Sequence, residues 1–234
     1  MTYVAEGHDP GARRGERFAD IETPGLVTEP LLMVEEISHR VVNEYAGAIA
    51  AINVEATHIV DADARAALRR TTGRLHAFAE AHRALQAPAA AGDICLGDYL
   101  DRVCAALSEA SLRERSVKLI LVEDDVTLEA KRCWRVALII AELITNSVQH
   151  RFQSSGGMIV VEIRQVGREI VCVVADNNGD CTPGPPSRGL RVVERLAREL
   201  SGDIQWLFGP RGVTVTLSFP TSQNLANALA SPDP

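Results

Sequence analysis

Several short groups of polar residues have the types and spacing that chemistry requires. In the segment GluIleSerHisArgValValAsn, Glu36, His39 and Asn43 are three and four residues apart, so a helix places them on one face. An imidazole that faces solvent is nucleophilic near neutral pH, because about half or more of it is unprotonated. An acidic neighbour such as Glu36 can orient the ring, and Asn43 can position a phosphoryl group or a water. The alternative is a histidine within a surface charge cluster.

A second group lies in GluLeuIleThrAsnSerValGlnHis, where Glu142, Asn146 and His150 follow one another at steps of four residues. A helix with this spacing offers oxygen ligands suited to Mg²⁺ beside a phosphate. The alternative is a set of buried polar residues that cap one another. The surrounding residues are apolar, and burying polar groups without partners is costly. This cost favours a ligand site.

Two further groups lie near loops rich in glycine and proline. In ValValAlaAspAsnAsnGly, which ends at Gly179, Asp176 closes an apolar strand. A carboxylate there can accept a hydrogen bond from the amino group of a ligand, although Asp-Asn-Asn-Gly is also an ordinary turn. Gly189 opens an amphipathic segment, and the backbone N–H groups at the start of a helix make an anion site.

Two amphipathic helices are predicted to position the first group. Apolar residues recur at helical steps, and we expect them on one face of the first helix: Val34, Ile37, Val41, Tyr45, Ala48, Ile52 and Ile59. Asp61 and Asp63 indicate the start of a second helix that stops near Pro88. Such a thin hairpin leaves an apolar seam exposed, so the pattern predicts a homodimer with a four-helix bundle.

The rest of the chain alternates between helical and strand patterns. Helices are expected over 97–111, 130–151 and 189–200, and strands over 117–122, 158–165, 169–175, 204–207 and 213–219. The predicted fold class is α+β, with a helical hairpin followed by an α/β sandwich. The expected divisions are a leader at 1–27, the hairpin at 28–88, the sandwich domain at 93–220 and a tail at 221–234.

Composition limits the classes of partner. The 234 residues have a net charge of −7, so a nucleic-acid partner is not expected. No stretch approaches the roughly 20 apolar residues that span a bilayer, and no signal peptide begins the chain, which predicts a cytoplasmic protein without a membrane anchor. The five cysteines form no CxxC pair and are expected to be reduced and mostly buried.

The order of these groups resembles that of bacterial two-component sensor histidine kinases, over roughly Leu31 to Pro220. HisArgValValAsn looks like the phosphoacceptor box of the HRxxN (HWE-like) class. The segments at 142–150, 176–179 and 188–193 look like the N box and the two glycine boxes of a GHKL-type ATP-binding domain. GlyValThrValThrLeuSerPhePro is similar to the closing hairpin of that domain.

The resemblance implies roles for the residues that match. His39 would be phosphorylated, with Glu36 and Asn43 assisting it. Glu142 and Asn146 would hold Mg²⁺, and Asp176 would bind the adenine amino group of ATP. The implied nucleotide site also includes Asn146, His150, Gly179 and, beside the phosphates, Gly189.

The resemblance also implies partners. A receiver domain of a response regulator would take the phosphoryl group from His39. The chain has little length for a sensory domain, so a separate sensor or upstream kinase protein is expected to supply the signal.

Five positions depart from the family pattern. Val42 and Gln149 stand where the family usually has lysine, Asn178 and Asp180 occupy glycine positions, and Ser187 replaces another glycine. Losing positive charge and adding a carboxylate weaken the neutralisation of phosphate. Non-glycine residues also restrict backbone conformations with positive φ.

The sequence therefore leaves alternative functions open. The first is a soluble histidine kinase that autophosphorylates His39 from ATP. The second is a dimeric histidine phosphotransferase or adaptor, with a degenerate ATP lobe, that relays phosphate between receiver domains. A third, an anti-σ-factor-like binding module, would not need the hairpin.

Overall fold

The structure is a computed structural model that describes residues 29–89, 92–150, 152, 156–179 and 188–222. These residues include the predicted hairpin and most of the predicted sandwich domain. The predicted leader and most of the predicted tail lie outside the described residues, as do Asp180 and Ser187.

Two antiparallel helices, α1 (Glu29–His58) and α2 (Ala62–Ala84), form the hairpin that the sequence predicts. The Asp61 carboxylate accepts a hydrogen bond from the Ala64 N–H at 2.7 Å, which confirms Asp61 as the cap of α2. At the other side of the turn, the Arg65 guanidinium donates to the Ile59 carbonyl at 2.7 Å. Both ends of the turn are therefore closed by side chains of α2 and its cap.

The buried face of α1 coincides only in part with the predicted apolar stripe. Val42 and Ile49 are buried, with 8% and 6% of their surfaces exposed, whereas Ile37 is 54% exposed and Ala48 is exposed. Val41 and Val42 are adjacent, so helical spacing alone allows either of two faces of α1 to pack against α2. In the structure Val42 is the buried one of the two. Tyr45 and Ile52 of the predicted stripe are half-buried, and the Tyr45 ring contacts His82 of α2. The face of α1 that packs on α2 therefore shares part of the predicted stripe and adds Val42 and Ile49.

A mixed five-stranded sheet follows, in the order β2-β4-β5-β7-β6. The strands are β2 (Val117–Glu123), β4 (Gly157–Val166), β5 (Glu169–Asp176), β6 (Asp203–Gly209) and β7 (Gly212–Pro220). β2 and β4 are parallel, and the other neighbours are antiparallel. Inward residues such as Ile159, Val161 and Ile163 on β4 are fully buried.

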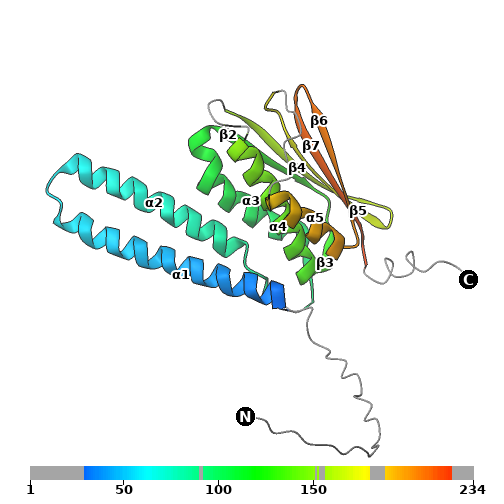
Figure 1. Ribbon diagram of the computed structural model, residues 1–234, viewed down its shortest axis with the longest axis horizontal. Coiled ribbons are helices and arrows are strands. Elements are labelled where there is room, and N and C mark those ends of the chain that lie inside the picture. Colours follow the sequence, from blue (N-terminus) through cyan, green and yellow to red (C-terminus); the bar gives the residue numbers. More distant parts are fainter. Residues whose placement is uncertain (1–28, 90–91, 151, 153–155, 180–187, 223–234) are drawn as a thin grey trace, which may run out of the picture.

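Three helices cover one face of this sheet (Figure 1): α3 (Leu96–Leu107), α4 (Ala130–His150) and α5 (Arg188–Glu199). Their apolar residues join those of the sheet in one core. The predicted α+β class, a hairpin followed by an α/β sandwich, is confirmed.

Smaller elements complete the sandwich domain. A two-stranded sheet that the sequence did not predict pairs β1 (Asp93–Cys95) with β3 (Thr127–Glu129). After α3 come a π-helical turn, η1 (Ser108–Leu112), and a 3₁₀ turn, η2 (Arg113–Arg115). The four cysteines of the described residues are free thiols, and burial raises the pKa of Cys104, Cys133 and Cys172 to about 12. Within the described ranges, no helix is both long and apolar enough to cross a membrane.

Candidate functional site

Glu142 and Asn146 lie one turn apart on α4, and both side chains are half-buried. The Asn146 side-chain amide donates to Glu142 Oε1 at 3.4 Å. Gly189, in the first turn of α5, lies directly against this pair, because a Cβ placed there would be 1.8 Å from Glu142 Oε1. The absence of a side chain at Gly189 thus allows the start of α5 to approach the polar face of α4.

Asp176 ends β5 and is buried, with 8% of its surface exposed. Its Oδ2 accepts a hydrogen bond from the Ser147 hydroxyl at 3.1 Å. Its Oδ1 accepts from the backbone N–H groups of Asn178 at 3.2 Å and Val213 at 3.4 Å. Such donors offset the cost of burying a carboxylate. Since Ser147 follows Asn146 in α4, the Asp176 site and the Glu142–Asn146 pair are parts of one contiguous site.

Two residues that did not stand out in the sequence shape this site. Ser147 lies inside the polar group at 142–150, and its position next to Asn146 was the available signal. Gly212 has a φ of +140°, and a Cβ there would lie 1.9 Å from the Asp176 carbonyl oxygen. Only glycine fits such a close approach of β7 to the end of β5.

The loop after β5 begins with a left-handed turn. Gly179 has a φ of +63°, which favours glycine, and nothing lies within 4 Å of a Cβ built there. The Asn177 side chain ties the start of the loop to β4 by accepting from the Met158 N–H at 2.8 Å. Gly179 is thus a turn residue at the edge of the site.

His150 and Gln149 follow Asn146 by about one turn and are exposed at the end of α4. That end is capped from a distant segment, since the Arg115 guanidinium donates to the Val148 carbonyl at 2.6 Å. The structure therefore places His150 in contact with solvent, one turn beyond the Glu142–Asn146 pair.

His39 lies within α1, but its side chain is outside the described part of the structure. Glu36 forms an ion pair with Arg40 at 2.6 Å, in which both side chains are about 70% exposed. Asn43 is also exposed. The two residues predicted to assist His39 therefore lie on the solvent-facing surface of α1.

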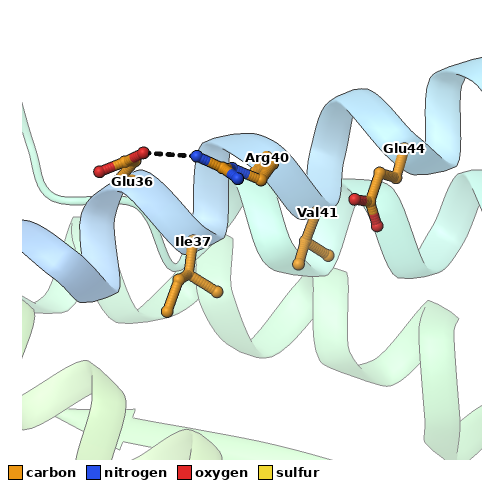
Figure 2. A pocket seen from close by; sticks show the side chains of 5 residues that line it. All are labelled: Glu36, Ile37, Arg40, Val41 and Glu44. Carbon is orange, nitrogen blue, oxygen red and sulfur yellow. Dashed lines mark hydrogen bonds and ion pairs between the residues drawn. The ribbon is translucent and has the colours of Figure 1, made fainter.

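A shallow pocket of about 360 Å³ flanks the same segment (Figure 2). Ile37 and Val41 point to one side of α1, while the paired Glu36 and Arg40 lie at the other, and Glu44 closes the row. Exposed apolar side chains beside charged ones suit contact with another protein.

The residues at the α4 site fit an ATP–Mg²⁺ group chemically. A carboxylate and an amide oxygen are the ligands that Mg²⁺ prefers, and this ion commonly keeps waters and phosphate oxygens as its other ligands. Across the described ranges, no cluster of three or more His, Cys, Asp or Glu residues could hold a metal by itself. A cation at Glu142 and Asn146 would therefore need phosphate oxygens or waters to complete its shell.

Known proteins share the sequence pattern of this chain. A family model described as histidine kinase (HisKA_2) matches residues 36–111, which include His39 and α2. Blue-light-activated histidine kinase 2 of Erythrobacter litoralis is 26% identical over 211 residues, which are 86% of this chain and 61% of that protein. The chain thus spans about three fifths of that relative.

Two solved structures share the fold. The histidine kinase domain of the blue-light-activated kinase of Erythrobacter litoralis has a TM-score of 0.55 at 21% identity, over 87% of this chain and 99% of that domain. A bacterial phosphotransferase has a TM-score of 0.57 at 13% identity, over 82% of this chain and 98% of the other. At these identities the solved structures show the fold alone. The family match and the curated relative support a two-component sensor histidine kinase of the HRxxN (HWE-like) class, the class that this chain resembles.

Proposed function

We propose that the chain is a protein-histidine kinase that autophosphorylates His39 from ATP and passes the phosphoryl group to an aspartate of a response-regulator receiver domain. One observation carries this proposal. A continuous series of contacts runs from the start of α5 to the end of β5, through Gly189, Glu142, Asn146, Ser147 and Asp176. Residues from three separate elements thus form two neighbouring polar groups: the Glu142–Asn146 pair beside Gly189, and the Asp176 carboxylate. A magnesium nucleotide offers a matching pair, since its phosphates carry the cation and its adenine carries an amino group.

Each of these two polar groups has a proposed role. An Asp176 oxygen accepts a hydrogen bond from the adenine amino group, and Glu142 and Asn146 contribute oxygens to Mg²⁺. Bound Mg²⁺ would neutralise charge on the phosphate oxygens. The backbone N–H groups at Gly189 face the phosphates, as the start of a helix favours anions.

Two further residues belong to the edge of the proposed nucleotide site. His150, exposed at the end of α4, and Gly179, in the turn after β5, would contact the nucleotide from its solvent side.

The phosphoacceptor is an imidazole nitrogen of His39. That nitrogen bonds to the γ-phosphorus as the bond to the bridging oxygen breaks, which leaves ADP and releases the imidazole proton to solvent. Asn43 positions the phosphoryl group, and the Glu36 carboxylate orients the ring when it leaves Arg40. The exchange of partners by Glu36 is inexpensive, because exposed ion pairs contribute about 0–1 kcal/mol.

The proposed partners follow from the exposed surface of the hairpin. A second copy covers the apolar seam that α2 leaves exposed, in a four-helix bundle. A receiver domain docks beside His39, on the side of α1 where the exposed Glu36 and Arg40 lie (Figure 2). The protein would act in the cytoplasm, with its signal supplied by a separate sensor or upstream kinase protein.

Calorimetry of ATP with Mg²⁺ tests the nucleotide site. We expect binding in the wild type and at least a tenfold loss in Asp176→Asn, which corresponds to about 1.4 kcal/mol. Asp203→Asn, on the exposed start of β6, is the matched control and should bind as the wild type does. Equal affinities in all three proteins would remove Asp176 from the site, and no binding in the wild type would reject the kinase.

A second candidate is the phosphotransferase or adaptor that relays phosphate between receiver domains without ATP. Val42 favours this candidate. It stands where the family usually has a lysine, and it is an apolar side chain buried in the hairpin, so this position supplies no positive charge to a phosphate of ATP. A phosphorylated receiver mixed with the protein, without nucleotide, should then label wild-type His39 and leave His39→Gln unlabelled.

A further inference from the structure

The end of α2 is capped by side chains of the sandwich domain. The last carbonyls of a helix have no partners within it, so they need outside donors or water. Here the Trp134 indole N–H donates to the Leu85 carbonyl at 2.8 Å, and the Tyr99 hydroxyl donates to the Gln86 carbonyl at 3.0 Å. Leu85 is the C-cap residue of α2, and Gln86 follows it.

The two donor side chains, Tyr99 and Trp134, are buried in the core of the sandwich domain. Tyr99 and Trp134 are each only 4% exposed, and they belong to α3 and α4 respectively. Only 4% of the chain is aromatic, so two such residues at one contact are a notable concentration. Burial also raises the pKa of the Tyr99 hydroxyl, which keeps it a donor. A buried Tyr or Trp needs a partner for its polar atom, and these two find theirs on the hairpin.

Packing reinforces these hydrogen bonds. Ala81 of α2 is buried within the core of the sandwich domain, and Ala84 and Leu85 pack against it. Further along α2, Arg74 pairs with Glu114 at 3.0 Å. Figure 1 shows the result, with α2 lying between α1 and α3.

This arrangement places the nucleotide site and the phosphoacceptor helix on different sides of α2. His39 belongs to α1, which packs on the far side of α2 from α3. Along α4, Glu142 and Asn146 lie roughly 12 and 18 Å beyond Trp134, at 1.5 Å per residue. The hydrogen bond at Trp134 therefore holds the helix that carries Glu142 and Asn146 against the end of α2, and α2 lies between α1 and α3.

We propose that Tyr99 and Trp134, with the carbonyls of Leu85 and Gln86, form a clasp that holds the sandwich domain against the end of α2, and that this clasp opens for ATP-dependent phosphorylation of His39. The opening rests on the kinase function proposed for this chain. Residues 87–89, directly after the clasp, are then the hinge, and a signal that displaces the end of α2 would act through the clasp.

Hydrogen exchange tests the clasp without nucleotide. Tyr99→Phe keeps the ring and deletes one donor, so the amides of residues 81–87 should exchange roughly fivefold faster, the ratio expected for the ~1 kcal/mol of one hydrogen bond. Tyr45→Phe is the matched control, because the Tyr45 ring contacts His82 inside the hairpin. Equal exchange in Tyr99→Phe and the wild type would overturn the clasp.

Tryptophan fluorescence tests whether the clasp opens when nucleotide binds. The chain has two tryptophans, so Trp206→Phe leaves Trp134 as the sole indole. Saturating ATP and Mg²⁺ should shift its emission to the red as the ring meets water, and unchanged emission would overturn the opening.

Autophosphorylation tests its effect on the reaction. The initial rate should rise about fivefold in Tyr99→Phe and in Trp134→Phe, and stay unchanged in Tyr45→Phe and Trp206→Phe, if one hydrogen bond holds the closed state. An unchanged or lower rate in folded clasp variants would overturn the proposal. No label in any protein would instead reject the kinase function, and hydrogen exchange would still decide whether the clasp exists.

Discussion

The hydroxyl of Ser147 on α4 donates a hydrogen bond to Oδ2 of Asp176 at the end of β5, over 3.1 Å. This contact joins the helix that carries Glu142 and Asn146 to the strand that carries the proposed adenine acceptor. It also fixes the orientation of a carboxylate that is only 8% exposed.

Ser147→Ala removes one donor to this buried carboxylate. We expect a loss of about 1 kcal/mol in the free energy of unfolding, and an ATP affinity lower by about fivefold because the carboxylate is less well oriented. Urea denaturation and calorimetry measure the two effects. Ser218→Ala, on the face of β7 opposite the buried Leu217 and Phe219, is the control. An Ala variant that binds ATP as the wild type does would show that Ser147 has no positioning role.

Gly189→Ala should weaken ATP binding strongly while changing the stability of the fold little. The new Cβ would lie 1.8 Å from Glu142 Oε1, so the flexible Glu142 side chain must move away from its place beside Asn146. We expect Mg²⁺-dependent ATP binding to fall at least tenfold, with a stability change within about 1 kcal/mol. Thermal unfolding and calorimetry check both values.

The control for this glycine is Gly73→Ala in the interior of α2, where nothing lies within 4 Å of a new Cβ. It should raise stability by about 0.5–1 kcal/mol and leave binding unchanged. Undiminished ATP binding by Gly189→Ala would contradict the placement of the cation at Glu142.

Local patterns predicted much of the fold, because each long element has a clear period and clear ends. The strand β5 and the helix α4 appear at nearly the predicted residues, and Asp61 caps α2 as expected. The adjacent residues Val41 and Val42 show the limit. Helical periodicity cannot choose between adjacent apolar residues, and the contact with α2 makes that choice.

The candidate site shows a similar limit. Glu142, Asn146 and Asp176 stand out in the sequence because polar residues interrupt apolar runs. Gly212 does not, since its role depends on the approach of β7 to Asp176, which only the sheet pairing creates. The clasp at Trp134 joins positions 49 residues apart, and no local pattern encodes such a contact.

Arg40→Glu should affect docking more than stability. Arg40 is paired with Glu36, but both are about 70% exposed, so the unfolding free energy should change by less than about 1 kcal/mol. Reversal of a charge beside the pocket at Ile37 should weaken receiver docking, measured by the rate of phosphoryl transfer from labelled protein. An aggregated variant, or transfer at the wild-type rate, would contradict this expectation.

Acid should destabilise the hairpin through His82. Burial lowers the pKa of His82 below its ordinary value of 6.5, so the unfolded chain binds more protons than the folded one as the pH falls. The contribution of neutral His82 to stability is therefore present above pH 6.5 and is lost as the pH falls through the lower pKa of the folded state. Denaturation can be compared at pH 7.5 and pH 5, buffers that lie about one unit or more either side of the ordinary histidine pKa. The free energy of unfolding should fall less between these two pH values in His82→Gln than in the wild type. Equal losses would exclude His82 as the cause.

Incubation with γ-labelled ATP and Mg²⁺ tests most directly whether this chain moves the γ-phosphoryl group of ATP to His39. We predict an acid-labile label on the wild type, none on His39→Gln, and little on Asp176→Asn, with all three proteins folded by circular dichroism. A wild type without acid-labile label, or a label that persists in His39→Gln, would contradict the proposed kinase activity.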